Sequence, residues 1–149
     1  MAKRMLVPLS QIAPADSFVA AVGDLARGAG ATVRLLHVAP PGQHVTDIDG
    51  RLIAYADQEA LRLESEGRDY LETIAALLDG IPVETTVRFG DPAREILAEA
   101  DEFGADLIAM GVGRRRRFLL RGGVAEQVFR RADVPVALLR AGRHESGGQ

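Results

Sequence analysis

Residues 87–111, "VRFGDPAREILAEADEFGADLIAMG", predict a complete strand–helix–strand unit. The stretch opens on the end of one candidate strand and closes on an apolar run of strand length. Between them, Asp91 suits a helix N-cap and Pro92 suits the first helical position. The helical spacing predicts an inward face made of Ile96, Leu97, Ala100 and Phe103. Two strands joined through one helix lie parallel, and such a crossover is right-handed.

The same alternation runs through the whole chain. Short apolar runs rich in branched residues predict five strands, at residues 5–9, 32–38, 82–89, 106–111 and 134–140. Amphipathic runs of helix length separate them. The order predicts an α/β fold, an open doubly wound five-stranded parallel sheet with helices on both faces. Such folds bind ligands beyond the carboxyl ends of their strands, where the winding direction reverses.

Three further helices are expected. The first lies between strands one and two, opened by Asp16 or Ser17 and closed by Gly28 or Gly30. A longer one is expected near residues 56–79, although Gly67 weakens its middle by about 1 kcal/mol relative to alanine. The last is "GGVAEQVFRRA", residues 122–132. The predicted inward faces are Phe18, Val22, Leu25 and Ala29 in the first helix, Leu63, Tyr70, Ile74 and Leu77 in the long one, and Val124, Val128 and Ala132 in the last.

Composition places the chain among soluble globular proteins. It has 149 residues, of which 47% are hydrophobic and 26% charged, and no apolar run approaches the roughly 20 residues that span a membrane. We expect one domain covering residues 1–140, followed by a disordered tail at residues 141–149. The sequence contains no cysteine, which excludes disulfides and thiolate metal sites. Because no apolar stretch of signal-peptide length is seen, we expect a cytoplasmic protein.

Positive charge is concentrated in one part of an acidic chain. Residues 111–140 hold eight arginines against two acidic side chains, a local excess of six charges, whereas the whole chain has a net charge of −3. Duplex DNA would be repelled by most of the remaining surface. The asymmetry therefore favours a local site for a small anion over broad nucleic-acid binding.

A glycine-bounded arginine run follows the fourth predicted strand. "GVGRRRRFLLRGG", residues 111–123, places Arg114–Arg117 and Arg121 between two glycine pairs. Glycine lets the backbone approach a ligand, and the free amides at the start of the next helix attract anions. Arginine adds charge-assisted contacts to phosphate oxygens. The alternative is that the glycines only permit a tight turn and the arginines face solvent.

Catalytic and metal-binding constellations are sparse. His37 lies on an apolar strand, where it is expected to be packed, and His44 and His144 lie in a loop and in the tail. Asp47 and Asp49 are better explained as turn residues than as cation ligands. No P-loop motif occurs, and no catalytic triad can be assembled. These patterns favour a binding module over an enzyme.

Four stretches resemble the universal stress protein family. They are "MLVPLS" at 5–10, "LLHVAPP" at 35–41, the stretch at 87–111, and "GGVAEQVFRRADVPVALLR" at 122–140. The resemblance covers roughly residues 3–140 and implies a Rossmann-like sheet of the adenine nucleotide alpha hydrolase-like kind. It also implies an ATP-binding and a non-binding branch, and dimers formed through the last strand. In this sequence that strand would contribute Val134, Val136 and Leu138.

The resemblance supplies the candidate nucleotide-binding residues. They are Leu9, Val38, Met110, Gly111, Gly113, Arg114, Gly122, Gly123 and Val124. The sequence departs from the Gly-x2-Gly-x9-Gly-Ser/Thr signature of the ATP-binding branch, because its loop is two residues shorter and Gly123 stands where the hydroxyl residue would be. Leu9 and Ser10 occupy the stretch where the family's nucleoside-contacting aspartate would lie. Each lost polar contact weakens binding by about 1 kcal/mol, whereas one arginine–phosphate pair supplies about 1.5–3 kcal/mol.

Two functions follow from these residues, and a third is weaker. The first is a stress-response module that binds ATP or another adenine nucleotide, with Mg²⁺ arriving on the nucleotide. The second is a ligand-free homodimer that binds a protein partner. The third, slow ATP hydrolysis, lacks a recognisable general base.

Overall fold

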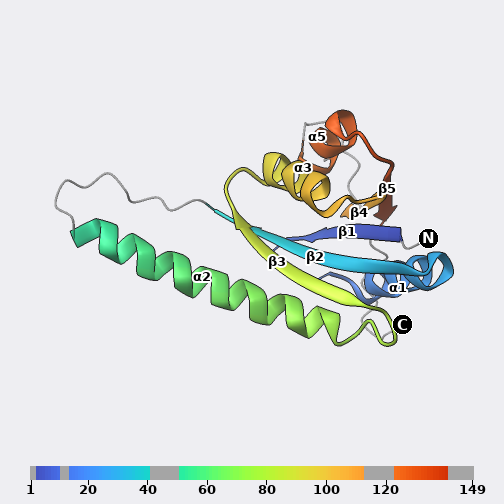
Figure 1. Cartoon of the computed structure of the whole chain (residues 1–149), viewed down its shortest axis with the longest axis horizontal. Helices are drawn as coiled ribbons and strands as arrows, with labels where there is room; N and C mark the ends of the chain where they lie inside the picture. The colour runs from blue at the N-terminus through green and yellow to red at the C-terminus, as the bar shows by residue number, and fades with distance from the viewer. Residues whose placement is uncertain (1–2, 11–13, 41–50, 113–122, 141–149) are drawn as a thin grey trace, which may run out of the picture.

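The predicted alternation of strands and helices is present in the computed structural model (Figure 1). The structure describes residues 3–10, 14–40, 51–112 and 123–140, with only the backbone for residues 51–57. The strands lie within two residues of their predicted bounds, which confirms the predicted fold class. The elements are β1 (Lys3–Leu9), α1 (Asp16–Ala29), β2 (Ala31–Ala39), α2 (Arg51–Ala75), β3 (Val83–Phe89), α3 (Pro92–Phe103), β4 (Leu107–Val112), α5 (Val124–Arg131) and β5 (Val136–Arg140).

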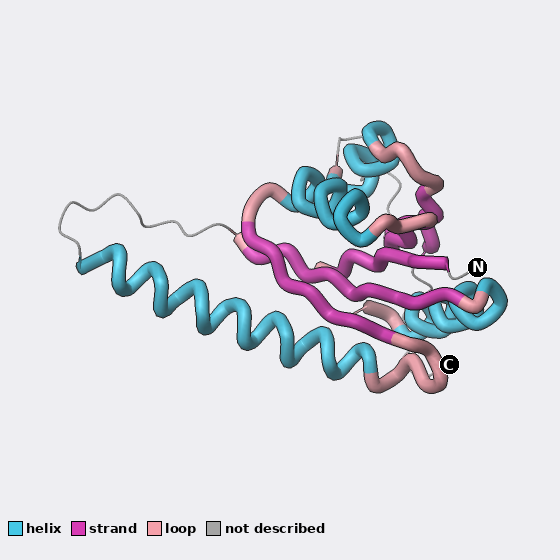
Figure 2. Tube along the Cα trace, in the orientation of Figure 1, coloured by secondary structure: helices cyan, strands magenta, loops and turns pink. Residues whose placement is uncertain are grey.

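The five strands form one parallel sheet in the order β3-β2-β1-β4-β5. From β1 the chain first moves outward through β2 to β3, and then returns past β1 to β4 and β5. Because each crossover is right-handed, this reversal places α1 and α2 on one face and α3 and α5 on the other (Figures 1 and 2). The switch point therefore lies between β1 and β4.

Alternate side chains of the central strand β1 fill two separate cores. Met5, Val7 and Leu9 belong to the core beneath α1 and α2. Leu6 belongs to the core beneath α3 and α5, together with Ile108 of β4. A strand that buries both faces reads as a continuous apolar run, which is why "MLVPL" is recognisable in the sequence.

Helix α3 begins as predicted. The Asp91 carboxylate accepts a hydrogen bond from the Arg94 amide at 3.0 Å, and Pro92 occupies the first turn. Gly104 ends the helix at φ 70°, in the left-handed region that glycine adopts without strain. Of the predicted inward residues, Ile96, Ala100 and Phe103 are buried and Leu97 packs against the same core.

The inward face of α1 differs from the prediction. Its N-cap is Ala15, which has no side-chain cap, so neither Asp16 nor Ser17 opens the helix, whereas Gly30 closes it as expected. Phe18 and Val22 are buried as predicted, but Leu25 is 40% exposed and Ala29 is exposed. The buried stripe instead includes the small residues Gly23 and Ala26. It comprises Phe18, Val19, Val22, Gly23 and Ala26.

Helix α2 is displaced toward the N-terminus relative to its predicted range, since it spans 51–75 rather than 56–79. Ile74 is buried and Tyr70 is partly buried, but Leu77 is 57% exposed because the helix has already ended there. Leu71 and Leu78 fill the core instead. The N-terminal half of α2 extends past the carboxyl edge of the sheet (Figure 2). Among the described residues, no helix is both long and apolar enough to cross a membrane.

Gly67 has a packing role that its low helix propensity alone does not reveal. It is buried where α2 crosses β2 and β3. A Cβ there would lie 3.0 Å from Cδ2 of His37 and 3.2 Å from a methyl group of Val87. The glycine therefore sets how closely α2 packs on the sheet.

We expect Gly67→Ala to lower the free energy of unfolding by about 1 kcal/mol, because the overpacking cost exceeds the gain in helix propensity. Gly28→Ala is the matched control, since Gly28 is helical, has no positive φ and has nothing within 4 Å of its added Cβ. That control should raise stability by about 0.5 kcal/mol. Urea unfolding measures both, and stabilisation by both substitutions would contradict the packing role.

Candidate functional site

Strands β1 and β4 are paired only near their starts, so they are not paired with each other at the carboxyl edge of the sheet, where the parallel strands end. The paired residues of these strands are Met5 with Leu107 and Leu6 with Ile108. Beyond them the strands continue to Leu9 and Val112 without further pairing within the described segments. A doubly wound fold places its ligand at such a point, where neighbouring strands lead to opposite faces.

The sequence-predicted site residues at this edge divide between the two faces. Leu9 is buried in the core beneath α1 and α2, and Met110 is buried in the opposite core, where the half-buried Val38 also packs. An added Cβ on Gly111 would lie 3.3 Å from Cδ1 of Phe18, so this glycine gives space to the first turn of α1. The four positions share the edge, but their side chains do not converge on one point.

The amino end of α5 has features of an anion site. Its N-cap is Gly123, which supplies no side-chain cap, and Val124 in the first turn is 37% exposed rather than packed as predicted. The amides of a first helical turn and the helix dipole favour a negative group. Glu126 in the same turn opposes this, although Arg130 pairs with its carboxylate at 2.8 Å. Gly113, Arg114 and Gly122 lie outside the described residues, so their roles stay predictions.

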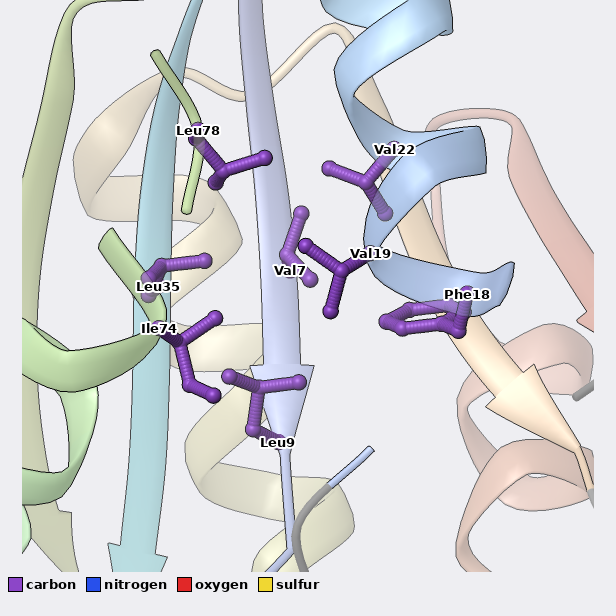
Figure 3. Close-up of a pocket in the computed structure, with 8 residues that line it drawn as sticks. All are labelled: Val7, Leu9, Phe18, Val19, Val22, Leu35, Ile74 and Leu78. Atoms are coloured by element: carbon purple, nitrogen blue, oxygen red, sulfur yellow. The ribbon is translucent and has the colours of Figure 1, made fainter. Parts of the chain in front are cut away.

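A small pocket beside the edge is apolar throughout. It lies between the sheet and helices α1 and α2, and side chains from both layers point into it (Figure 3). It supplies no polar group that would hold a phosphate or the edge of a base, so we regard it as a packing gap of the core. Its lining residues are Val7, Leu9, Phe18, Val19, Val22, Leu35, Ile74 and Leu78.

His37 is packed, as its strand position predicted. It is 6% exposed, its ring meets that of Tyr70 edge-on at 5.9 Å, and its Nδ1 lies 3.3 Å from the carbonyl oxygen of Leu9. Burial raises the pKa of the Tyr70 hydroxyl. His44, Asp47 and Asp49 lie outside the described residues. Within the described part, no group of three or more His, Asp or Glu side chains is placed to hold a metal ion.

A buried ionic cluster beneath α3 was not predicted. The side chain of Glu99 is 3% exposed and lies between two strand arginines, with Arg34 on β2 at 2.6 Å and Arg88 on β3 at 2.7 Å. Arg34 also binds Glu84, and Arg88 also binds Glu95. The signal in the sequence was an arginine at an inward position of an otherwise apolar strand, "TVRLLHV".

Neighbouring glutamates raise the pKa of both arginines in this cluster. Burial alone would lower the pKa of Arg34, but its hydrogen bonds to Glu99 and Glu84 raise it above the ordinary value. Hydrogen bonds to Glu95 and Glu99 raise the pKa of Arg88. The guanidinium of Arg34 also lies 4.1 Å from the ring centre of Phe103, within cation–π range. The cluster joins α3 to β2 and β3. Because both of its arginines are paired with carboxylates of the fold, we assign the cluster no role in ligand binding.

Solved structures share this fold over nearly the whole chain. The protein MJ0577 is 23% identical, with a TM-score of 0.76, over 95% of this chain and 97% of that one. A universal stress protein in complex with cAMP is 18% identical, with a TM-score of 0.63, over 94% and 98%. The universal stress protein of Archaeoglobus fulgidus in complex with dAMP is 24% identical, with a TM-score of 0.58, over 91% and 96%. The TM-scores show that these proteins and this chain share a fold.

A curated relative matches part of the sequence. Universal stress protein MJ0531 of Methanocaldococcus jannaschii is 32% identical over 87 residues, which are 56% of this chain. The match spans about half, 51%, of that relative's length.

The strand order and the edge at the switch point define a Rossmann-like α/β protein. The family model of the universal stress proteins matches residues 1–140. The chain therefore belongs to the universal stress protein family, as its sequence resemblance had indicated.

We expect Glu99→Gln to lower the free energy of unfolding by about 2 kcal/mol, because two partly buried guanidinium groups lose a buried charged partner while each keeps another carboxylate. The matched control is Glu102→Gln, on the same helix and against the same Arg88, because the Glu102 side chain is 66% exposed. That exposed pair should contribute less than about 0.5 kcal/mol. Equal losses from the two variants in urea unfolding would contradict the distinction.

Proposed function

We propose that this universal stress protein is a regulatory module of the stress response that binds ATP or another adenine nucleotide at the carboxyl edge of its sheet. The observation that carries the proposal is the unpaired edge between β1 and β4, from which β4 leads through the arginine-rich loop to the uncapped start of α5. An adenine nucleotide fits this arrangement because its phosphates would meet both amides and guanidinium groups. Structures of the same fold in complex with cAMP and dAMP support this ligand class.

The binding residues would act mainly through their backbones. Leu9 and Met110 turn their side chains into the two cores, so they would shape the edge rather than offer polar side chains. Val38 and Val124 are partly exposed and would supply apolar contact to a base or ribose. Mg²⁺ would arrive with the nucleotide, and we assign no catalytic role to the chain. A cytoplasmic location belongs to the same proposal.

We expect isothermal titration of nucleotide-free protein with Mg-ATP, ADP and AMP to show one saturable site. In the double variant Arg114→Ala/Arg115→Ala, affinity for ATP should fall at least about tenfold, because each arginine–phosphate pair contributes about 1.5–3 kcal/mol. AMP, with fewer phosphates, should lose less.

The double variant Arg27→Ala/Arg131→Ala, in the last turns of α1 and α5, removes the same charge away from the loop and is the matched control. Absence of heat at millimolar nucleotide would eliminate the proposal. Equal losses of ATP affinity in the two double variants would mean that the loop acts only through its overall charge.

A second function, a homodimer that binds a protein partner, is favoured by the position of β5 at the sheet edge. The carbonyl of Pro135 accepts a hydrogen bond from the Ile108 amide, so the backbone groups of residue 135 face β4. Because successive residues alternate, the backbone groups of Val136 and Leu138 face outward, where a second copy would pair. The side chains of Val134, Val136 and Leu138 are half-buried.

We expect size-exclusion chromatography with light scattering to show a dimer for the wild type and a monomer for Val136→Pro. Proline removes one outward-facing amide at the first residue of β5, where it is compatible with an edge strand. Circular dichroism must be unchanged for the comparison to hold. A wild-type monomer at micromolar concentration would overturn the dimer.

A further inference from the structure

His37 joins three parts of the molecule at the carboxyl edge. It lies on β2 in register with Leu9, the last residue of β1, and its ring nitrogen reaches the carbonyl oxygen of Leu9. The other side of the ring faces α2, where Gly67 lacks the Cβ that would collide with Cδ2 and where Tyr70 makes an edge contact. The ring is therefore held between the end of β1 and the long helix.

The geometry fixes which nitrogen carries the hydrogen. A carbonyl oxygen only accepts, so Nδ1 of His37 must donate to Leu9, at 3.3 Å. The bond is at the long end of the usual range, but both partners are buried and exchange for water is restricted. Protonation of the ring is not needed for this contact.

The acceptor lies at the point where the candidate ligand edge begins. β1 is no longer paired with β4 beyond Leu6, and past Leu9 the chain leaves the sheet toward α1. The Leu9 carbonyl belongs to the peptide group that leads out of β1. Its direction therefore influences the path of the backbone where it leaves the strand. On the other side, α2 extends past the same edge (Figure 2).

We propose that His37 is a positioning residue for the adenine-nucleotide site, holding the exit of β1 in place through the Leu9 carbonyl while Gly67 and Tyr70 hold its ring. This inference rests on the proposed function, and it assigns His37 no contact with the ligand. Because the ring also packs against α2, the position of that helix affects how firmly His37 holds the exit of β1.

A matched pair of substitutions isolates the hydrogen bond from the packing. Asn and Leu have the same number of side-chain heavy atoms and the same branching at Cγ, and Leu is the bulkier of the two. Any gap beside Gly67 is therefore smaller in His37→Leu than in His37→Asn, so a loss confined to His37→Leu does not come from a cavity. The Asn amide can donate from near the place of Nδ1, whereas Leu cannot. We expect His37→Leu to weaken ADP binding about fivefold, the loss of one typical hydrogen bond, and His37→Asn to bind within about twofold of the wild type. Equal affinities in the two variants would overturn the inference.

A second readout does not need nucleotide. In ¹⁵N-edited spectra of the free protein, wild-type His37 should show the tautomer protonated at Nδ1, and the amides of Leu9 and Ser10 should exchange faster in His37→Leu than in His37→Asn. If the wild type binds no nucleotide, the proposed function fails, and the exchange data still decide whether His37 holds the exit of β1. The opposite tautomer, or equal exchange in both variants, would overturn that role.

Discussion

The structure depends on one constraint, the burial of β1 on both faces at the centre of a parallel sheet. Met5 and Val7 fill the core beneath α1 and α2, and Leu6 fills the core beneath α3 and α5. Because right-handed crossovers must cover both faces, the chain winds outward from β1 in both directions. The switch point, and with it the place of the candidate ligand site, follows from this position of β1 rather than from any individual polar residue.

Local signals made most of the fold predictable. Asp91 and Pro92 mark the start of α3 through chemistry confined to a few neighbouring residues, and the structure confirms it. Predictions about helix faces were less accurate, as Leu25 and Leu77 show, because several apolar stripes fit the same amphipathic sequence. Only the approach of the helix to the sheet selects among them. In α1 the stripe that packs against the sheet runs through Phe18, Val22 and Ala26.

The candidate site was less accessible to sequence reasoning for a different reason. The spacing predicts Gly111 as a glycine that admits a ligand, but it does not reveal that the missing Cβ also leaves room for Phe18 from a distant segment. Glu99 reads as an ordinary polar position of a surface helix, yet two arginines from separate strands bury it. Such roles are created by contacts between elements, and neither spacing nor composition carries them.

Charge explains why a basic loop suits an acidic body. Two arginines of the sheet are neutralised within the fold, since Arg34 and Arg88 each bind at least two carboxylates. Neighbouring arginines in the run at 114–117 repel one another, so an anion that binds them relieves repulsion as well as adding contacts. A compact ligand gains this without meeting the negative remainder of the surface, whereas an extended polyanion meets both. The distribution of charge thus favours the proposed small phosphorylated ligand, and this argument is independent of the departures from the glycine signature.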